Sequence, residues 1–149
     1  MKINVFSIVK NDDYQPIYND FIKQCKGFGA TLVLKDIFNN DIAKAQKATP
    51  KEAQSSYTQA LKPFLSPSSY ALHPKGKTLD SFEFAKLFSN SLEVNFFIGG
   101  AYGFDEEFIS QTKPLSLTPL TLSHKVAKVV LCEQIYRALS INANHPYHK

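Results

Sequence analysis

The sequence predicts an α/β domain built on a largely parallel sheet. Short apolar or alternating segments, typical of β-strands, are separated by longer segments whose apolar residues recur at helical spacing. The chain has 149 residues, of which 44% are hydrophobic and 20% charged. This is the composition of a globular domain with a core of its own. We therefore expect residues 1–149 to form one domain, with helices flanking the sheet.

Ten segments are expected to form regular structure. The expected strands are residues 3–9, 30–37, 69–72, 94–98 and 115–117, and the expected helices are 17–25, 50–61, 79–92, 105–110 and 124–141. Alternating apolar and polar residues predict the first strand, and valine and leucine dominate the second. Between them, apolar residues at helical spacing stop just before Gly27 and Gly29, which end the helix.

The middle and the end of the chain continue this alternation. Residues 39–49 are polar and carry lysines, so we expect a loop there, and Pro50 suits the first turn of the next helix. The apolar run VNFFI at residues 94–98 predicts a buried strand. Acidic residues open the short helix at 105–110, where they suit the helix dipole. The last helix has a broad apolar face.

Composition also restricts the setting in which the protein acts. No apolar run reaches the roughly 20 residues that a membrane-spanning helix needs, and the first ten residues alternate like a strand rather than a signal peptide. We expect a cytoplasmic protein without membrane contact. Cys25 and Cys132 lie in apolar periodic segments, which predicts buried free thiols. The sequence contains no cluster of cysteine and histidine residues that would indicate a metal site.

The chain carries a formal net charge of +4, and 16 of its 17 basic residues are lysines. Lys44, Lys47 and Lys51 form one loose group, and Lys75 with Lys77 forms another. Such groups either belong to an ordinary solvated surface or follow the phosphates of a nucleic acid. The sequence leaves both interpretations open.

Ligands of parallel α/β folds bind beyond the carboxyl ends of the strands. This rule points to three turns, at residues 72–76, 99–103 and 117–123. The second turn has the spacing GGxxG rather than the GxGxxG of a dinucleotide fold, and it is either a tight turn or a nucleotide cradle. Gly76-Lys77-Thr78 is no phosphate-binding loop, because Ala71 stands where that loop needs glycine. No GxSxG elbow supports a serine hydrolase.

The chain ends in NHPYHK, which places two of its four histidines in the last six residues. Pro146 separates His145 from His148 and breaks the helical geometry that a metal pair would use. Imidazole titrates near neutral pH and can carry protons, so we interpret the tail as substrate-facing. A disordered basic tail is the alternative.

Together these features resemble the ribosomal large-subunit pseudouridine N3-methyltransferases, small members of the knotted (SPOUT) methyltransferase class. The similarity covers the whole chain in layout and is specific in the C-terminal half. The segments that carry it are FFIGG at 96–100, LTPLTLSH at 117–124 and EQIYRALSINANHPYHK at 133–149.

The resemblance implies an α/β trefoil knot with a mostly parallel sheet, and a homodimer. It also implies S-adenosyl-L-methionine as methyl donor, and the N3 of a pseudouridine in the 23S rRNA of the assembled ribosome as acceptor. A non-catalytic RNA- or nucleoside-binding module of the same fold and a tRNA methyltransferase of the same class are the alternatives.

The resemblance also implies which residues form the site. The cofactor would contact Leu72, Gly99, Gly100, Leu117, Thr118, Pro119, Leu120, Thr121 and Leu122. Tyr147, His148 and Lys149 would line the substrate side, in a site completed by a partner subunit. The chain departs from the family pattern at His73, where an acidic residue is usual, and at Ala101 and Tyr102, where proline and an acidic residue are usual.

Elementary chemistry suggests roles for the expected catalytic residues. The N3 atom must lose its proton before it attacks, and His148 is the candidate acceptor. Lys149 or Arg137 would stabilise the negative charge that develops on the flanking carbonyl oxygens. Arg137 equally suits a structural ion pair with Glu133, four residues earlier on the same helix face.

Overall fold

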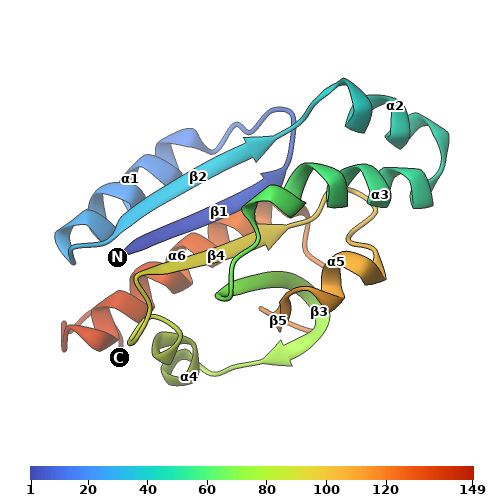
Figure 1. The fold of residues 1–149 in the computed structure, drawn as a ribbon. Coiled ribbons are helices and arrows are strands. Elements are labelled where there is room, and N and C mark those ends of the chain that lie inside the picture. The colour runs from blue at the N-terminus through green and yellow to red at the C-terminus, as the bar shows by residue number, and fades with distance from the viewer.

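Five parallel strands form one sheet in the order β2-β1-β4-β3-β5 (Figure 1). The computed structural model describes all residues, 1–149. The strands are β1 (Lys2–Ile8), β2 (Thr31–Ile37), β3 (Ser69–Thr78), β4 (Glu93–Ile98) and β5 (Lys113–Ser116). The predicted α/β class with a parallel sheet is confirmed.

Helices cover both faces of this sheet. They are α1 (Gln15–Gly27), α2 (Asn40–Ala48), α3 (Pro50–Leu61), the short 3₁₀ helix η1 (Lys62–Phe64), α4 (Ser81–Lys86), α5 (Glu106–Ser110) and α6 (His124–Asn142). Buried residues of α1, α4 and α6 pack with Ile3 and Val5 of β1, whereas α2, α3 and α5 pack with Phe6 and Ile8. The two-residue alternation of the strand thus divides the core into two layers.

The expected loop at residues 39–49 was wrong, because this segment contains helix α2. The Asn39 side chain accepts a hydrogen bond from the Ile42 amide (2.8 Å), which caps the helix N-terminus. Ile42 is fully buried, and the alanine, lysine and glutamine residues around it favour helix. The polar composition therefore reflects an exposed outer face rather than a loop.

The helix expected at residues 79–92 is shorter than predicted. Asp80 and Glu83 form a capping box at the start of α4, and the helix ends at Lys86 in a series of turns. Phe82 and Leu92, which a helix over residues 79–92 would place on one apolar stripe with Ala85 and Phe88, are 57% and 89% exposed. Serine and asparagine at residues 89–91 favour turns over helix, which explains the early end.

The third strand, by contrast, extends beyond the expected residues 69–72. A bulge between Leu72 and Lys77 interrupts its pairing with β5, which then resumes. At Gly76 a Cβ atom would lie 2.6 Å from the backbone nitrogen of Leu115, so only glycine lets the two strands approach this closely. The remaining elements lie within two residues of their predicted bounds.

Cys25 and Cys132 are buried free thiols, as predicted. Burial raises the pKa of Cys25 to about 11 and that of Cys132 to about 12, so neither is a thiolate at neutral pH. None of the helices combines the length and the apolar character needed to cross a membrane.

Candidate functional site

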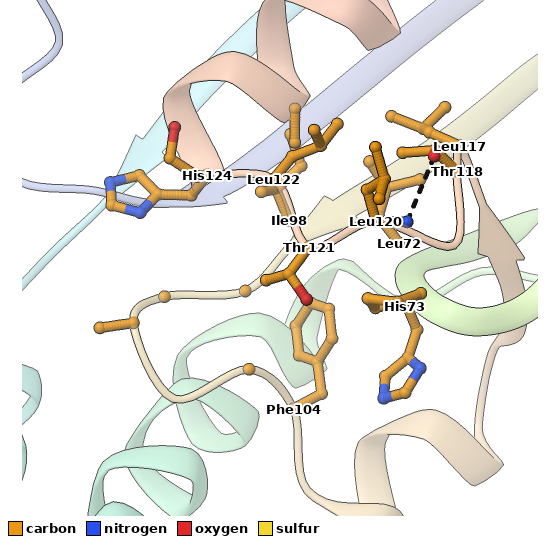
Figure 2. Close-up of a pocket in the computed structure, with 17 residues that line it drawn as sticks. Leu72, His73, Ile98, Phe104, Leu117, Thr118, Leu120, Thr121, Leu122 and His124 are labelled. Carbon is orange, nitrogen blue, oxygen red and sulfur yellow. Dashed lines mark hydrogen bonds between the residues drawn. The ribbon is translucent and has the colours of Figure 1, made fainter.

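Three segments that follow or interrupt strands meet at the carboxyl edge of the sheet and line a cavity of about 410 Å³ (Figure 2). One comes from the bulge of β3, one from the glycine turn after β4, and one from the connection between β5 and α6. The lining residues are Leu72, His73, Pro74, Ile98, Gly99, Gly100, Ala101, Gly103, Phe104, Leu117, Thr118, Leu120, Thr121, Leu122, Ser123, His124 and Ala127. The volume is that of a pocket for a small ligand.

All but one of the residues expected to contact the cofactor line this cavity. The exception is Pro119, which is exposed and lies outside it. His73 and Ala101, where the chain departs from the family pattern, also line the cavity, whereas the exposed Tyr102 does not. Two of the three departures therefore change the wall of the cavity itself.

The cavity wall is apolar on one side. Figure 2 shows Leu72, Leu117 and Leu120 together on that side, with the Phe104 ring and His73 opposite. The Leu120 side chain is 71% exposed, although most leucines in proteins are buried. An apolar group bound in the cavity would cover this leucine and remove its surface from water.

Backbone amides around the cavity are free to bind a ligand. Between residues 118 and 122 only the Leu120 amide has a partner within the protein, the Thr118 hydroxyl (3.2 Å). The amides of Thr121 and Leu122 donate no hydrogen bond within the protein, and neither do those of Gly99 and Gly100. Amides left without partners normally bond to water or to a ligand, so this site suits a ligand that carries acceptor atoms.

The glycine turn is held in place by α3. The Gly103 amide donates to the Gly100 carbonyl (3.0 Å), and Gly103 adopts φ +69°, a conformation that favours glycine. A Cβ atom at Gly100 would lie 2.7 Å from the ring of Tyr57, which is fully buried. The Tyr57 hydroxyl donates to Gln46 Oε1 (2.6 Å), which fixes the ring against the turn. Tyr57 therefore sets the position of the backbone that lines the cavity.

A buried charged cluster lies beside the first turns of α6, and sequence analysis did not identify it. The Lys128 ammonium donates to Asp36 Oδ1 (2.7 Å) and Asp12 Oδ2 (3.2 Å), and it lies 4.3 Å from the Tyr18 ring centroid. The Tyr18 hydroxyl also donates to Asp12 (2.7 Å). The partners of Lys128 lie 92 and 116 residues away in sequence, so no local pattern could have revealed the cluster.

This cluster ties the β1–α1 connection and the end of β2 to the helix that forms part of the cavity wall. Burial raises the pKa of Asp12, but hydrogen bonds from Tyr18, the Tyr14 amide and Lys128 outweigh it, and the pKa is lowered overall. Burial, with Lys125, lowers the pKa of His124, which lines the cavity one turn before Lys128. The imidazole is therefore neutral at neutral pH.

The C-terminal tail lies at the other end of α6. His124 lines the cavity, and Arg137 follows 13 residues later, which corresponds to about 20 Å along the helix. Asn144 adopts φ +53° where the chain leaves the helix, and Figure 1 places the C-terminus near α4, away from the carboxyl ends of the strands. One subunit therefore does not bring its own tail to its own cavity.

The expected catalytic residues of the tail contact the helix instead. Arg137 donates from Nε (3.0 Å) and Nη2 (2.6 Å) to Glu133 Oε1, which is the ion pair that the helical spacing suggested. Tyr147 donates its hydroxyl proton to the same oxygen (3.0 Å) and packs on Tyr136. Hydrogen bonding to Glu133 raises the pKa of Arg137. Lys149 is exposed and forms no ion pair.

The contact between Arg137 and His148 fixes the roles of the ring nitrogens. Arg137 Nη1 lies 3.1 Å from His148 Nδ1, and because a guanidinium can only donate, Nδ1 must accept. The proton of a neutral ring is then on Nε2. In this arrangement His148 offers a donor, and it can accept a proton only after the contact with Arg137 breaks.

Comparison with known proteins defines the class of this protein. A family model described as "Predicted SPOUT methyltransferase" matches residues 1–148. The chain belongs to this family, and it is therefore a methyltransferase with the α/β trefoil-knot fold of the SPOUT class.

Its relatives narrow the class further. The chain is 50% identical to the "Ribosomal RNA large subunit methyltransferase H" of Helicobacter acinonychis (strain Sheeba) and to that of Helicobacter pylori (strain J99), over 100% of both chains in each case. The protein of the same name from Helicobacter hepaticus is 47% identical, again over the full length of both chains.

No group of three or more His, Cys, Asp or Glu side chains is arranged to hold a metal ion.

The contact between Gly100 and Tyr57 predicts the effect of a single methyl group. We expect Gly100→Ala to lower the free energy of unfolding by about 1–3 kcal/mol and to raise the Kd for S-adenosylmethionine, because the new Cβ pushes the turn away from the Tyr57 ring. Urea unfolding and calorimetry measure the two effects. Gly27→Ala is the matched control, since a Cβ there meets nothing within 4 Å. Equal affinities for S-adenosylmethionine in the wild-type protein and both variants would show that cofactor binding does not depend on the position of the turn.

The buried cluster predicts a dependence on both charge and pH. We expect Lys128→Met to lower the free energy of unfolding by about 3 kcal/mol, because it leaves the Asp12 carboxylate buried without its cation. The folded pKa of Asp12 is lowered, so its contribution is present above pH 3.8, its ordinary pKa, and is lost as the pH falls further.

Urea unfolding between pH 3 and pH 7 measures both parts of this prediction. Lys125→Met is the control, since Lys125 lies 3.8 Å from the exposed Asp13, and such a pair contributes at most about 1 kcal/mol. A Lys128→Met variant as stable as the control would contradict the role given to the cluster.

Proposed function

We propose that this protein transfers the methyl group of S-adenosylmethionine to N3 of a pseudouridine in 23S rRNA, pseudouridine 1915, within the assembled ribosome. The observation that carries the proposal is the cavity at the carboxyl edge, lined by free backbone amides and a glycine turn. The full-length similarity to ribosomal RNA large subunit methyltransferases supports this choice of substrate.

The cavity residues fit the proposed cofactor. Adenine and a carboxylate both present acceptor atoms, which suit the free amides of Gly99, Gly100, Thr121 and Leu122. The leucines of the apolar side would pack against the uncharged parts of the ligand. The ligand would in turn cover the exposed side chain of Leu120. His124 is neutral at neutral pH, so it places no positive charge beside a cationic sulfonium. When bound, the cofactor supplies an electrophilic methyl group.

The protein's own residues would orient the acceptor base and handle its proton. Methyl transfer is an in-line displacement, so correct positioning supplies much of the rate acceleration. His148 is the proposed proton acceptor for N3, a role that requires it to leave Arg137. Arg137 and Lys149 would then stabilise the charge on the carbonyl oxygens beside N3.

A homodimer would bring the tail and the cavity together. Within one subunit they lie about 20 Å apart along α6, which is too far for Tyr147 or His148 to reach the methyl acceptor. We propose that each complete site combines the cavity of one subunit with the tail of its partner. Two-fold symmetry then gives two equivalent sites per dimer.

A methyl-transfer assay with a tail-deleted variant tests the proposed function. The wild-type protein is expected to transfer a labelled methyl group to undermethylated ribosomes, and mass spectrometry should locate it on N3 of one pseudouridine. Deletion of residues 147–149 should abolish transfer and leave the Kd for S-adenosylmethionine unchanged, because these residues do not line the cavity of their own subunit and are proposed to act on the substrate side of the partner's site. Transfer to tRNA alone, or tight cofactor binding without transfer, would contradict the proposal.

Mixed dimers test whether the tail acts in the partner's site. Tail-deleted protein and Gly100→Ala protein are each expected to be impaired, but refolding them together forms dimers with one intact cavity and one intact tail. About a quarter of the wild-type activity should then return, since half of the dimers are mixed and each has one complete site. Failure to recover activity from two stable, dimeric variants would mean that the tail serves its own subunit.

A further inference from the structure

Three lysines mark the outer face of the α2–α3 hairpin, residues 40–61. Lys44 and Lys47 are three residues apart in α2, so they lie on one face of the helix, and Lys51 follows in the first turn of α3. All three are exposed, and none forms an ion pair with a carboxylate. The opposite side of α2 carries the buried Ile42.

The acidic residues of this hairpin stabilise its helices, whereas most of its three lysines do not. Asp41 and Glu52 lie in the first turns of their helices, where a negative charge suits the dipole, and Glu52 also accepts from the Thr49 hydroxyl (3.2 Å). Lys47 lies in the last turn of α2 and also suits the dipole. Lys51, however, stands at the positive end of α3, where a cation is unfavourable.

A residue that opposes the local preference of its helix often serves function instead. Replacing Lys51 with a neutral residue would favour the helix, and the hairpin would lose no internal contact with a carboxylate. The presence of Lys51 in the same hairpin as the exposed Lys44 and Lys47 therefore indicates a negatively charged partner outside the protein.

The hairpin is also attached directly to the cavity. Its inner side holds the glycine turn, through Tyr57 against Gly100 and through a hydrogen bond from Gln54 Nε2 to the Tyr102 carbonyl (2.8 Å). In Figure 1, α2 and α3 extend beyond the carboxyl ends of β1 and β2, at the edge of the sheet where the cavity lies. A polymer bound along the hairpin would therefore pass close to the cavity.

We propose that the outer face of the α2–α3 hairpin is a docking surface for RNA, on which Lys44, Lys47 and Lys51 bind backbone phosphates. This inference rests on the proposed function, which makes RNA the substrate. Phosphate contacts of this kind fix the position and orientation of the nucleic acid without reading its sequence. The hairpin thus holds the RNA that flanks the target nucleotide, while the cavity and the tail act on the base.

Salt-dependent binding tests the docking surface without any need for catalysis. The triple variant Lys44→Gln, Lys47→Gln and Lys51→Gln is compared with the wild-type protein for binding to undermethylated ribosomes at several salt concentrations. Each lost phosphate contact makes the slope of log K against log salt shallower by roughly 0.7–0.9. We therefore expect a slope shallower by about 2–3, a higher Kd for ribosomes, and an unchanged Kd for S-adenosylmethionine.

A second triple variant separates this surface from a general effect of net charge. Lys23→Gln, Lys26→Gln and Lys86→Gln removes the same charge from exposed lysines of α1 and α4, on the opposite layer of the molecule. This control should keep the wild-type slope. Light scattering and thermal unfolding show whether all three proteins share one oligomeric state and fold, and lysine and glutamine have similar helix propensities.

The outcomes distinguish the docking surface from the function it rests on. A wild-type slope in the hairpin variant, or an equal loss in both variants, would overturn the docking surface. If the wild-type protein binds ribosomes but transfers no methyl group, the proposed function fails, while the comparison of slopes still decides whether the hairpin binds RNA. If the wild-type protein shows no salt-dependent binding to ribosomes, the docking surface is refuted directly.

Discussion

Five parallel strands must end at the same edge of the sheet, and the arrangement of the site follows from this constraint. The bulge of β3, the turn after β4 and the connection after β5 all lie at that edge because their strands are neighbours in the sheet. β3 lies between β4 and β5 in the sheet, so the three segments leave from adjacent strands. The glycine turn and the bulge of β3 precede the connection after β5 by about 20 and about 45 residues in sequence, yet all three segments line one cavity.

Two buried interactions hold this cavity from different sides. Tyr57, fixed by Gln46, presses against the glycine turn from the α3 layer. Lys128, paired with Asp12 and Asp36, anchors the start of α6 to the β1–α1 connection and the end of β2. Both are long-range contacts, and loss of the second would leave a buried charge unpaired, so they favour a preformed cavity. The tail, in contrast, packs at the far end of α6, with His145 against Phe28 and His148 against Phe82 of α4.

The sequence predicted the fold well where local patterns determine structure. The alternating strand at residues 3–9, the apolar strand at 94–98 and the long helix from residue 124 appeared within two residues of their predicted bounds. Helix α2 was missed because its outer face is polar, although Asn39 and Ile42 carry a cap and a core contact that could have revealed it. The Lys128 cluster could not be predicted, since its members come together only through the sheet.

Mapping S-adenosylmethionine onto the protein by NMR tests the central claim, that the cofactor binds at the carboxyl edge of the sheet. Titration of ¹⁵N-labelled protein should shift the amide signals of Gly99, Gly100, Thr121 and Leu122, residues of the cavity wall whose amides have no partner within the protein. The signals of residues 1–4, at the opposite edge, should not move. Shifts confined to the amino edge, or to the tail of residues 144–149, would contradict the account.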